Sequence, residues 1–209
     1  MSLVMVADPE RTDNATAIEE CARLGFLRKE WSTLDPTYGY GRFWTKWRPD
    51  YLIGTDKNPK KSPGEIGVEP DIRLCNRSID FREMPWLDRA FDAVVFDPPY
   101  KLSGTPDMDA MDERYGIDVP ERWQDRMQLC IDGVRECARV ADKMLLVKCQ
   151  DQVCSGQMRW QTREFIEGLP FRLVTHLQVK SYLPQPEGTS QKHPRNNFST
   201  LLVLRRRRR

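Results

Sequence analysis

The chain has 209 residues, 39% of them hydrophobic and 10% aromatic, which is typical of a globular domain and excludes a disordered one. No apolar run is long enough to cross a bilayer and the first residues lack the positive region of a signal peptide, so we expect a cytoplasmic protein without a membrane partner. Six cysteines without a Cys-x-x-Cys pair, and two histidines, favour reduced thiols and no metal site.

The charge is nearly balanced, with 33 basic and 31 acidic residues. Five of the basic residues form the run Arg205–Arg209, so the rest of the chain carries 28 basic and 31 acidic residues. We expect a single domain over residues 1–204 followed by a basic tail at 205–209. Affinity for a nucleic acid would have to come from a local patch and this tail, which could equally be a solvated end.

The pattern of apolar residues and breakers predicts alternating strands and helices along the chain. Helices are expected at 14–24, 121–140 and 158–168, and strands at 31–34, 51–54, 71–75, 91–96, 143–149, 171–179 and 199–204. Pro120 suits the start of the second helix. This order predicts an α/β fold with a mostly parallel sheet and helices on both faces. The last two strands are joined by a loop without a helical pattern, so we expect them to pair antiparallel.

The clearest strand, Phe91–Phe96, ends at Asp97-Pro98-Pro99-Tyr100. Residues that precede proline are held extended, and the prolines have a fixed φ and no N–H. This predicts a stiff arm with an exposed carboxylate, free carbonyls and an aromatic tip. An ordinary proline turn is the alternative.

Such an arm suits chemistry on the exocyclic amino group of a base, whose lone pair is delocalised into the ring. The Asp97 carboxylate and the Pro98 carbonyl could accept its two hydrogens, and Tyr100 could stack on the extruded base. No covalent intermediate on the protein is needed.

Acidic residues also follow the three preceding strands, although each alone could be a surface charge. Asp35 comes before a loop with Gly39 and Gly41, which permit close approach of the backbone to a ligand. Its carboxylate could meet an ammonium group, and Asp56 could bind ribose hydroxyls. In Asp80-Phe81, the acid could accept from an adenine amino group and the ring could cover the base. If the first and fourth strands are neighbours, Asp35 and Asp97 face one crevice.

These loops resemble those of the amino-methyltransferase family, the N6-adenine and N4-cytosine enzymes. Asp97-Pro98-Pro99-Tyr100 matches the family's catalytic tetrapeptide, and the segment from Asp35 to Gly41 is similar to its cofactor loop. The resemblance implies a Rossmann-like seven-stranded fold, S-adenosylmethionine as methyl donor and adenine rather than cytosine as target. The expected catalytic residues are Asp97, Pro98, Pro99 and Tyr100, and the expected cofactor-binding residues are Asp35, Pro36, Thr37, Gly39, Gly41, Asp56, Asp80 and Phe81.

The target contacts are expected in loops, because 55 residues between the two motifs leave no room for a large recognition domain. The segment 101–119 is acidic and is predicted to be a lid, whereas 180–197 is predicted to contact nucleic acid. The expected substrate-binding residues are Lys101, Lys192, His193, Arg195 and Asn197.

Methylation of adenine N6 in DNA is the function this pattern favours. Three alternatives remain: an RNA base methyltransferase acting on adenine N6 or guanine N2, a protein glutamine methyltransferase, and a non-catalytic nucleic-acid-binding module.

Overall fold

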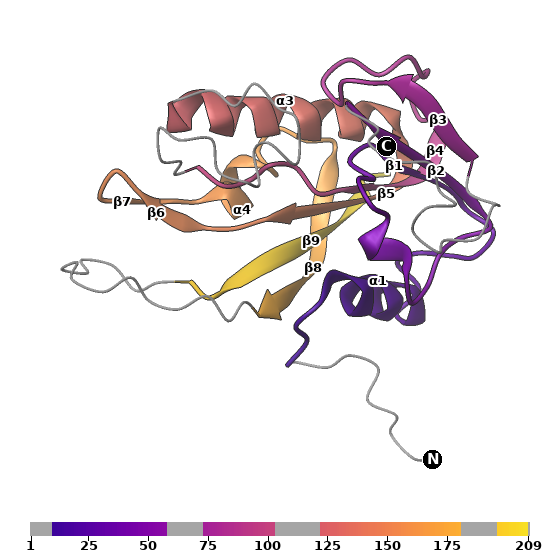
Figure 1. Cartoon of the computed structure of the whole chain (residues 1–209), viewed down its shortest axis with the longest axis horizontal. Helices are drawn as coiled ribbons and strands as arrows, with labels where there is room; N and C mark the ends of the chain where they lie inside the picture. Colours follow the sequence, from indigo (N-terminus) through magenta and orange to yellow (C-terminus); the bar gives the residue numbers. More distant parts are fainter. Residues whose placement is uncertain (1–9, 58–72, 103–121, 181–195, 209) are drawn as a thin grey trace.

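The computed structural model describes residues 10–57, 73–102, 122–180 and 196–208, and its centre is a seven-stranded sheet (Figure 1). The sheet has the order β3-β2-β1-β4-β5-β9-β8. Its strands are β1 (Ser32–Asp35), β2 (Tyr51–Asp56), β3 (Arg73–Ser78), β4 (Phe91–Phe96), β5 (Ala141–Cys149), β8 (Phe171–Lys180) and β9 (Phe198–Arg206). The first five strands of this order pair in parallel, and β9 is antiparallel to both its neighbours. The predicted seven-stranded sheet with an antiparallel last strand is confirmed.

Helices cover both faces of the sheet, as the sequence predicted. Figure 1 shows α3 (Trp123–Val140) on one side, and α1 (Asn14–Arg23) with the short 3-10 helix η1 (Arg42–Trp44) on the other. Each face has its own buried apolar cluster, because successive strand residues point to opposite sides. No helix in the described part of the chain is long and apolar enough to cross a membrane.

Local sequence explains where these helices form. The Asp13 carboxylate caps α1 by accepting a hydrogen bond from the Thr16 backbone N–H at 2.8 Å. The buried face of α3 recurs every three or four residues, through Met127, Cys130, Val134 and Cys137. The helix begins at Trp123, two residues later than predicted, and Pro120 lies outside the described residues.

Of the helix predicted at 158–168, only the single turn α4 (Gln161–Glu164) is helical, and the rest of the prediction is wrong. A hairpin of β6 (Gln152–Cys154) and β7 (Gln157–Arg159) precedes this turn. The turn of the hairpin consists of Ser155 and Gly156, with φ values of 52° and 72°. Two consecutive left-handed residues are typical of two-residue hairpin turns and end any helical pattern.

The boundary of the basic tail also differs from the prediction, because β9 continues to Arg206. The Arg206 guanidinium donates to the carbonyls of Ala138 and Ala141 at the C-terminus of α3, where a helix has unpaired carbonyls. The Arg207 backbone N–H donates to the Pro170 carbonyl. The first arginines of the run therefore belong to the fold.

Candidate active site

The carboxyl ends of β1, β2 and β4 lie side by side, because β1 pairs in parallel with both other strands. The first and fourth strands are thus neighbours, which was the condition for Asp35 and Asp97 to lie close together. The loops that follow β1 and β4 are joined directly, since the Asp97 backbone N–H donates to the Thr37 hydroxyl at 2.9 Å. The two motifs found in the sequence thus meet at one edge of the sheet.

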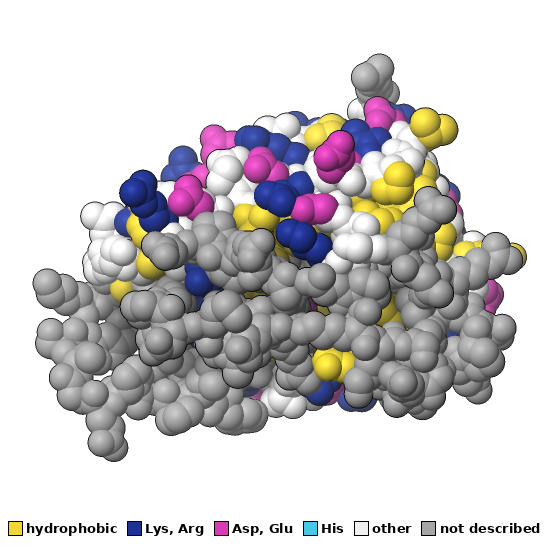
Figure 2. All heavy atoms as spheres, turned by 45° about the horizontal axis from the view of Figure 1, so that its top comes forward, with side chains coloured by type: hydrophobic (Ala, Val, Ile, Leu, Met, Phe, Trp, Pro, Cys, Tyr) yellow, Lys and Arg dark blue, Asp and Glu magenta, His cyan; other side chains and the backbone are white. Residues whose placement is uncertain are grey.

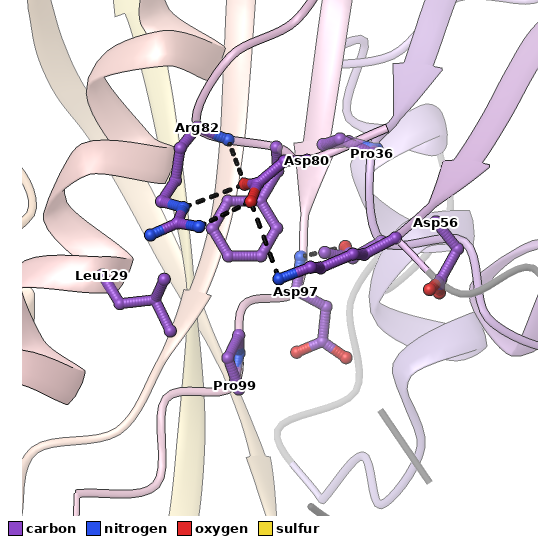
Figure 3. A pocket seen from close by; sticks show the side chains of 10 residues that line it. Pro36, Asp56, Asp80, Arg82, Asp97, Pro99 and Leu129 are labelled. Atoms are coloured by element: carbon purple, nitrogen blue, oxygen red, sulfur yellow. Dashed lines mark hydrogen bonds and ion pairs between the residues drawn. The ribbon is translucent and has the colours of Figure 1, made fainter. Parts of the chain in front are cut away.

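A pocket of about 440 Å³ opens at this edge (Figure 3). Seven of its lining residues were predicted from the sequence: Pro36, Thr37, Asp56, Asp80, Phe81, Asp97 and Pro99. Three were missed: Lys57, Arg82 and Leu129. Lys57 and Arg82 stand next to or near predicted acids in the sequence, whereas only the packing of α3 brings Leu129 to the pocket.

The glycine loop approaches the pocket through its backbone. Gly39 and Gly41 have φ values of 51° and 64°, a region that favours glycine. The Gly39 N–H donates to Asp56 Oδ2 at 3.2 Å, which ties this loop to the end of β2. A Cβ on Gly41 would lie 2.5 Å from the Tyr38 hydroxyl, so glycine is required there. Tyr38 itself is 8% exposed and belongs to the apolar cluster beneath the loop.

Asp35 does not face the pocket, contrary to the expected contact with an ammonium group. Its side chain turns inward and accepts hydrogen bonds from the Thr37 backbone N–H at 3.0 Å and from the Trp44 indole N–H at 2.8 Å. Burial raises the pKa of this carboxyl to about 7, against the opposing effect of these donors. Asp35 therefore stabilises the turn after β1 through hydrogen bonds on its buried side.

Asp80 faces the pocket, but its carboxylate is held by neighbours. It accepts from Arg82 through the backbone N–H at 2.9 Å, Nε at 3.0 Å and Nη2 at 2.6 Å, as Figure 3 shows. These hydrogen bonds from Arg82 lower the pKa of Asp80. The next residue, Phe81, is 7% exposed and packs edge-on against Phe96 with ring centroids 5.1 Å apart. Both residues are thus committed to local contacts, and each presents only part of its side chain to a ligand.

The Asp97 carboxylate points into the pocket beside Pro99 (Figure 3). Its side chain is 20% exposed, whereas Oδ1 itself is buried and accepts no hydrogen bond from the described part of the chain. The nearest cation is the Lys148 ammonium, 3.8 Å from Oδ1, which is beyond hydrogen-bonding distance. Burial raises the pKa of Asp97, and Lys148 acts in the opposite direction. The site therefore holds an acceptor with unused capacity.

The two prolines of the tetrapeptide are held by hydrogen bonds to their backbone carbonyls. The Pro98 carbonyl accepts from the Tyr100 N–H at 2.7 Å, so one of its two lone pairs is already used. The Pro99 carbonyl accepts from the Cys130 thiol at 3.6 Å. The Pro98 carbonyl that we expected to be free thus keeps one acceptor position.

Two glutamines that the sequence did not reveal, one of them fully buried, anchor Tyr100. Its carbonyl accepts from Gln152 Nε2 at 2.9 Å and from Gln161 Nε2 at 2.6 Å. Gln161 is fully buried, and its Oε1 accepts from the Gln150 backbone N–H at 3.0 Å. Such glutamines carry no signal in the sequence, because glutamine is usually a surface residue.

The predicted substrate-binding residues are only partly located. Lys101 is exposed directly after Tyr100, and Asn197 is exposed just before β9. Gln150 Nε2 donates to the carbonyls of Asn196 and Phe198 at 3.3 and 3.2 Å, so Asn197 lies close to Gln150 at the end of β5. Lys192, His193 and Arg195 lie outside the described residues, as does most of the predicted lid.

The described surface on the α3 side carries charges of both signs. Figure 2 shows its Lys and Arg side chains interspersed with Asp and Glu. Ion pairs within this surface include Arg139–Glu136 at 2.7 Å and Arg135–Asp132 at 4.0 Å. The arginines at the end of β9 lie at the opposite end of the strands from the pocket. The nine residues of β9 separate the two ends by about 30 Å. Contacts to a phosphate backbone near the pocket are therefore expected from its surrounding loops.

Many solved structures have a similar fold, and three of them have nearly equal TM-scores. They are TrmN from Thermus thermophilus (TM-score 0.56, 14% identity), the magnesium protoporphyrin IX methyltransferase ChlM from Synechocystis PCC 6803 with bound SAM (0.57, 12%), and the [4+2]-cyclase SpnF (0.56, 14%). The alignments cover 92, 93 and 92% of this chain and 48, 78 and 79% of those chains. The chain spans about half the length of TrmN.

The chain has the fold of these three proteins. No protein-family model matches its sequence, and a comparison with curated proteins finds no match. SpnF, a cyclase, shows that this fold also serves other chemistry. The Rossmann-like fold is thus confirmed, whereas the resemblance to the amino-methyltransferases stays a prediction that rests on the two loops.

Proposed function

We propose that the protein transfers a methyl group from S-adenosylmethionine to an exocyclic amino group of a nucleic-acid base, with N6 of adenine in DNA as the favoured target. The observation that carries the proposal is the Asp97 carboxylate, whose Oδ1 accepts no hydrogen bond from the described residues and which lines the same pocket as Thr37 and Asp56. A carboxylate oxygen left unused at the wall of a pocket is placed to take hydrogens from a reacting amine.

The pocket suits the adenosine part of S-adenosylmethionine. Asp56, at the end of β2, is placed to accept from ribose hydroxyls, and the glycine loop leaves room beside it. Pro99, Leu129 and the exposed part of Phe81 provide apolar walls for a base. When bound, the cofactor supplies an electrophilic methyl group. The ammonium of its methionine part would need partners other than Asp35, because that carboxylate faces the interior.

The residues of the chain would act mainly by holding the target amine. Asp97 Oδ1 and the remaining lone pair of the Pro98 carbonyl would accept its two hydrogens, which localises the nitrogen lone pair. Tyr100, partly exposed at the end of the tetrapeptide, would stack on the extruded base. Preorganised acceptors of this kind cost little reorganisation during the reaction.

The test is incubation with methyl-labelled S-adenosylmethionine and, separately, duplex DNA, single-stranded DNA and total RNA, followed by nucleoside analysis. We expect label in N6-methyladenine from DNA. Label found only in RNA nucleosides would replace DNA by RNA as the substrate. Label in a protein fraction alone would favour the glutamine methyltransferase, and cofactor binding with no transfer to any acceptor would support a binding module.

A further inference from the structure

Lys148 lies in a position where lysine is rarely found. It is the second-last residue of β5, paired with Leu201 of β9, and it is 8% exposed. The preceding residues, from Met144 to Val147, are apolar and at most 1% exposed. An ammonium group is costly to bury unless charged or polar groups compensate for the loss of water. The groups around Lys148 therefore indicate what it does.

The Lys148 ammonium contacts both ends of the Asp97–Tyr100 segment. Its Nζ lies 3.8 Å from Asp97 Oδ1. Burial raises the pKa of Tyr100, the Lys148 and Ser199 side chains act in the opposite direction, and the Lys148 Nζ is 5.4 Å from the centroid of the Tyr100 ring. The Phe43 ring from η1 lies on another side, with its centroid 5.6 Å from Nζ. One cation on β5 thus faces a carboxylate and two aromatic rings.

We propose that Lys148 is a positioning residue for the reaction, which holds the Asp97 carboxylate and the Tyr100 hydroxyl in one arrangement from the neighbouring strand. This inference rests on the proposed function. The two prolines between Asp97 and Tyr100 stiffen the middle of the segment but do not orient the side chains at its ends. Lys148 orients both, and the glutamines at the Tyr100 carbonyl fix the backbone behind them.

The distance between Lys148 and Asp97 matters for this role. At 3.8 Å the ammonium balances the charge of the carboxylate without donating a hydrogen bond to Oδ1. The other carboxyl that interacts with Asp97 is Asp35, at the end of the adjacent strand β1, and Asp97 helps to raise the pKa of Asp35. Without Lys148, the effect of burial on Asp97 would be unopposed and would favour its protonation, and a protonated carboxyl is a poorer acceptor.

The test compares Lys148→Met and Lys148→Arg with Lys143→Met, a control on the same strand whose exposed side chain pairs with Asp92. We expect Lys148→Met to lower kcat at least about tenfold, with KM for S-adenosylmethionine changed less than about twofold. The acid limb of its pH–rate profile should move to higher pH by about one unit, because the cation that favours ionised Asp97 is gone. Lys148→Arg should recover much of the rate, and Lys143→Met should behave as wild type. An unchanged kcat and acid limb in Lys148→Met would overturn the proposal.

A second measurement needs no substrate. The Asp97 carboxyl is titrated by ¹³C NMR in wild type and in Lys148→Met, and the Lys148 side chain is titrated in wild type and in Asp97→Asn. We expect the Asp97 midpoint to rise without Lys148 and the Lys148 midpoint to fall without Asp97. If Lys148→Met does not fold, the Asp97→Asn comparison decides. Independent titrations would overturn this inference alone, whereas absence of methyl transfer by the wild type would overturn the proposed function.

Discussion

Two turns at neighbouring strand ends have nearly the same sequence but opposite carboxylate environments. Asp35-Pro36-Thr37-Tyr38 follows β1, and Asp97-Pro98-Pro99-Tyr100 follows β4. In the first turn the acid accepts from the N–H two residues later, at Thr37. In the second turn that position is Pro99, which has no N–H. Asp97 Oδ1 is accordingly left without a hydrogen bond. A single proline separates a structural acid from one that is available to a ligand.

From this comparison we expect removal of Asp97 to lower turnover and removal of Asp35 to lower stability. Asp97→Ala should lower kcat by roughly 10²–10³-fold or more, because it removes an acceptor for the reacting amine. Cofactor binding, measured by calorimetry, should be nearly unchanged. Asp132→Asn, an exposed change on α3, serves as the control. Equal losses of turnover and cofactor binding would mean that Asp97 has a structural role instead.

Asp35→Ala should act mainly on stability. It leaves the buried Trp44 indole N–H and the Thr37 N–H without their acceptor, which costs about 1–3 kcal/mol of unfolding free energy. Urea denaturation measures this loss. Asp50→Ala is the matched control, because its exposed carboxylate pairs only with a surface lysine at 3.2 Å. A fully stable Asp35→Ala protein would show that the first turn does not depend on its acid.

Pro99→Thr makes the two turns identical in sequence. It therefore tests directly whether the missing N–H at position 99 keeps Asp97 without a hydrogen bond. The new N–H at position 99 should donate to Asp97, as Thr37 does to Asp35. One competing hydrogen bond is worth about 1 kcal/mol, so kcat should fall about fivefold at unchanged stability. Pro85→Thr, on the exposed chain before β4, controls for loss of a proline. Wild-type rates in Pro99→Thr would show that the missing N–H is not what keeps Asp97 available.

The pH dependence of stability should report the raised pKa of Asp35. Burial raises the pKa of Asp35 from 3.8 to about 7, so the folded protein binds this proton more tightly than the unfolded chain. The contribution is present below about pH 4 and is lost as pH rises toward 7, at about 1 kcal/mol per pH unit or less. Denaturation curves of wild type and Asp35→Asn between these pH values measure it. Parallel pH profiles for the two proteins would contradict the assigned pKa.

The sequence was sufficient for the sheet and for the position of both motifs, because apolar strand runs and the breakers that end them are local signals. It could not reveal which way Asp35 turns, since that depends on Trp44 from η1. Lys148 was hidden for a similar reason. From sequence alone, a lysine in a strand is interpreted as a surface residue. Only the packing of β4, β9 and η1 around β5 brings Lys148 into the site. The hairpin at 152–159 was missed because its short strands carry no clear alternation.

The most direct test of the central claim is a crystal structure with a non-reactive analogue of S-adenosylmethionine and an adenine-containing oligonucleotide. The account predicts the analogue in the pocket beside Asp56, and the adenine N6 within about 2.6–3.2 Å of Asp97 Oδ1. A bound base whose amino group lies beyond hydrogen-bonding distance of Asp97, with that carboxylate paired instead to Lys148, would contradict it.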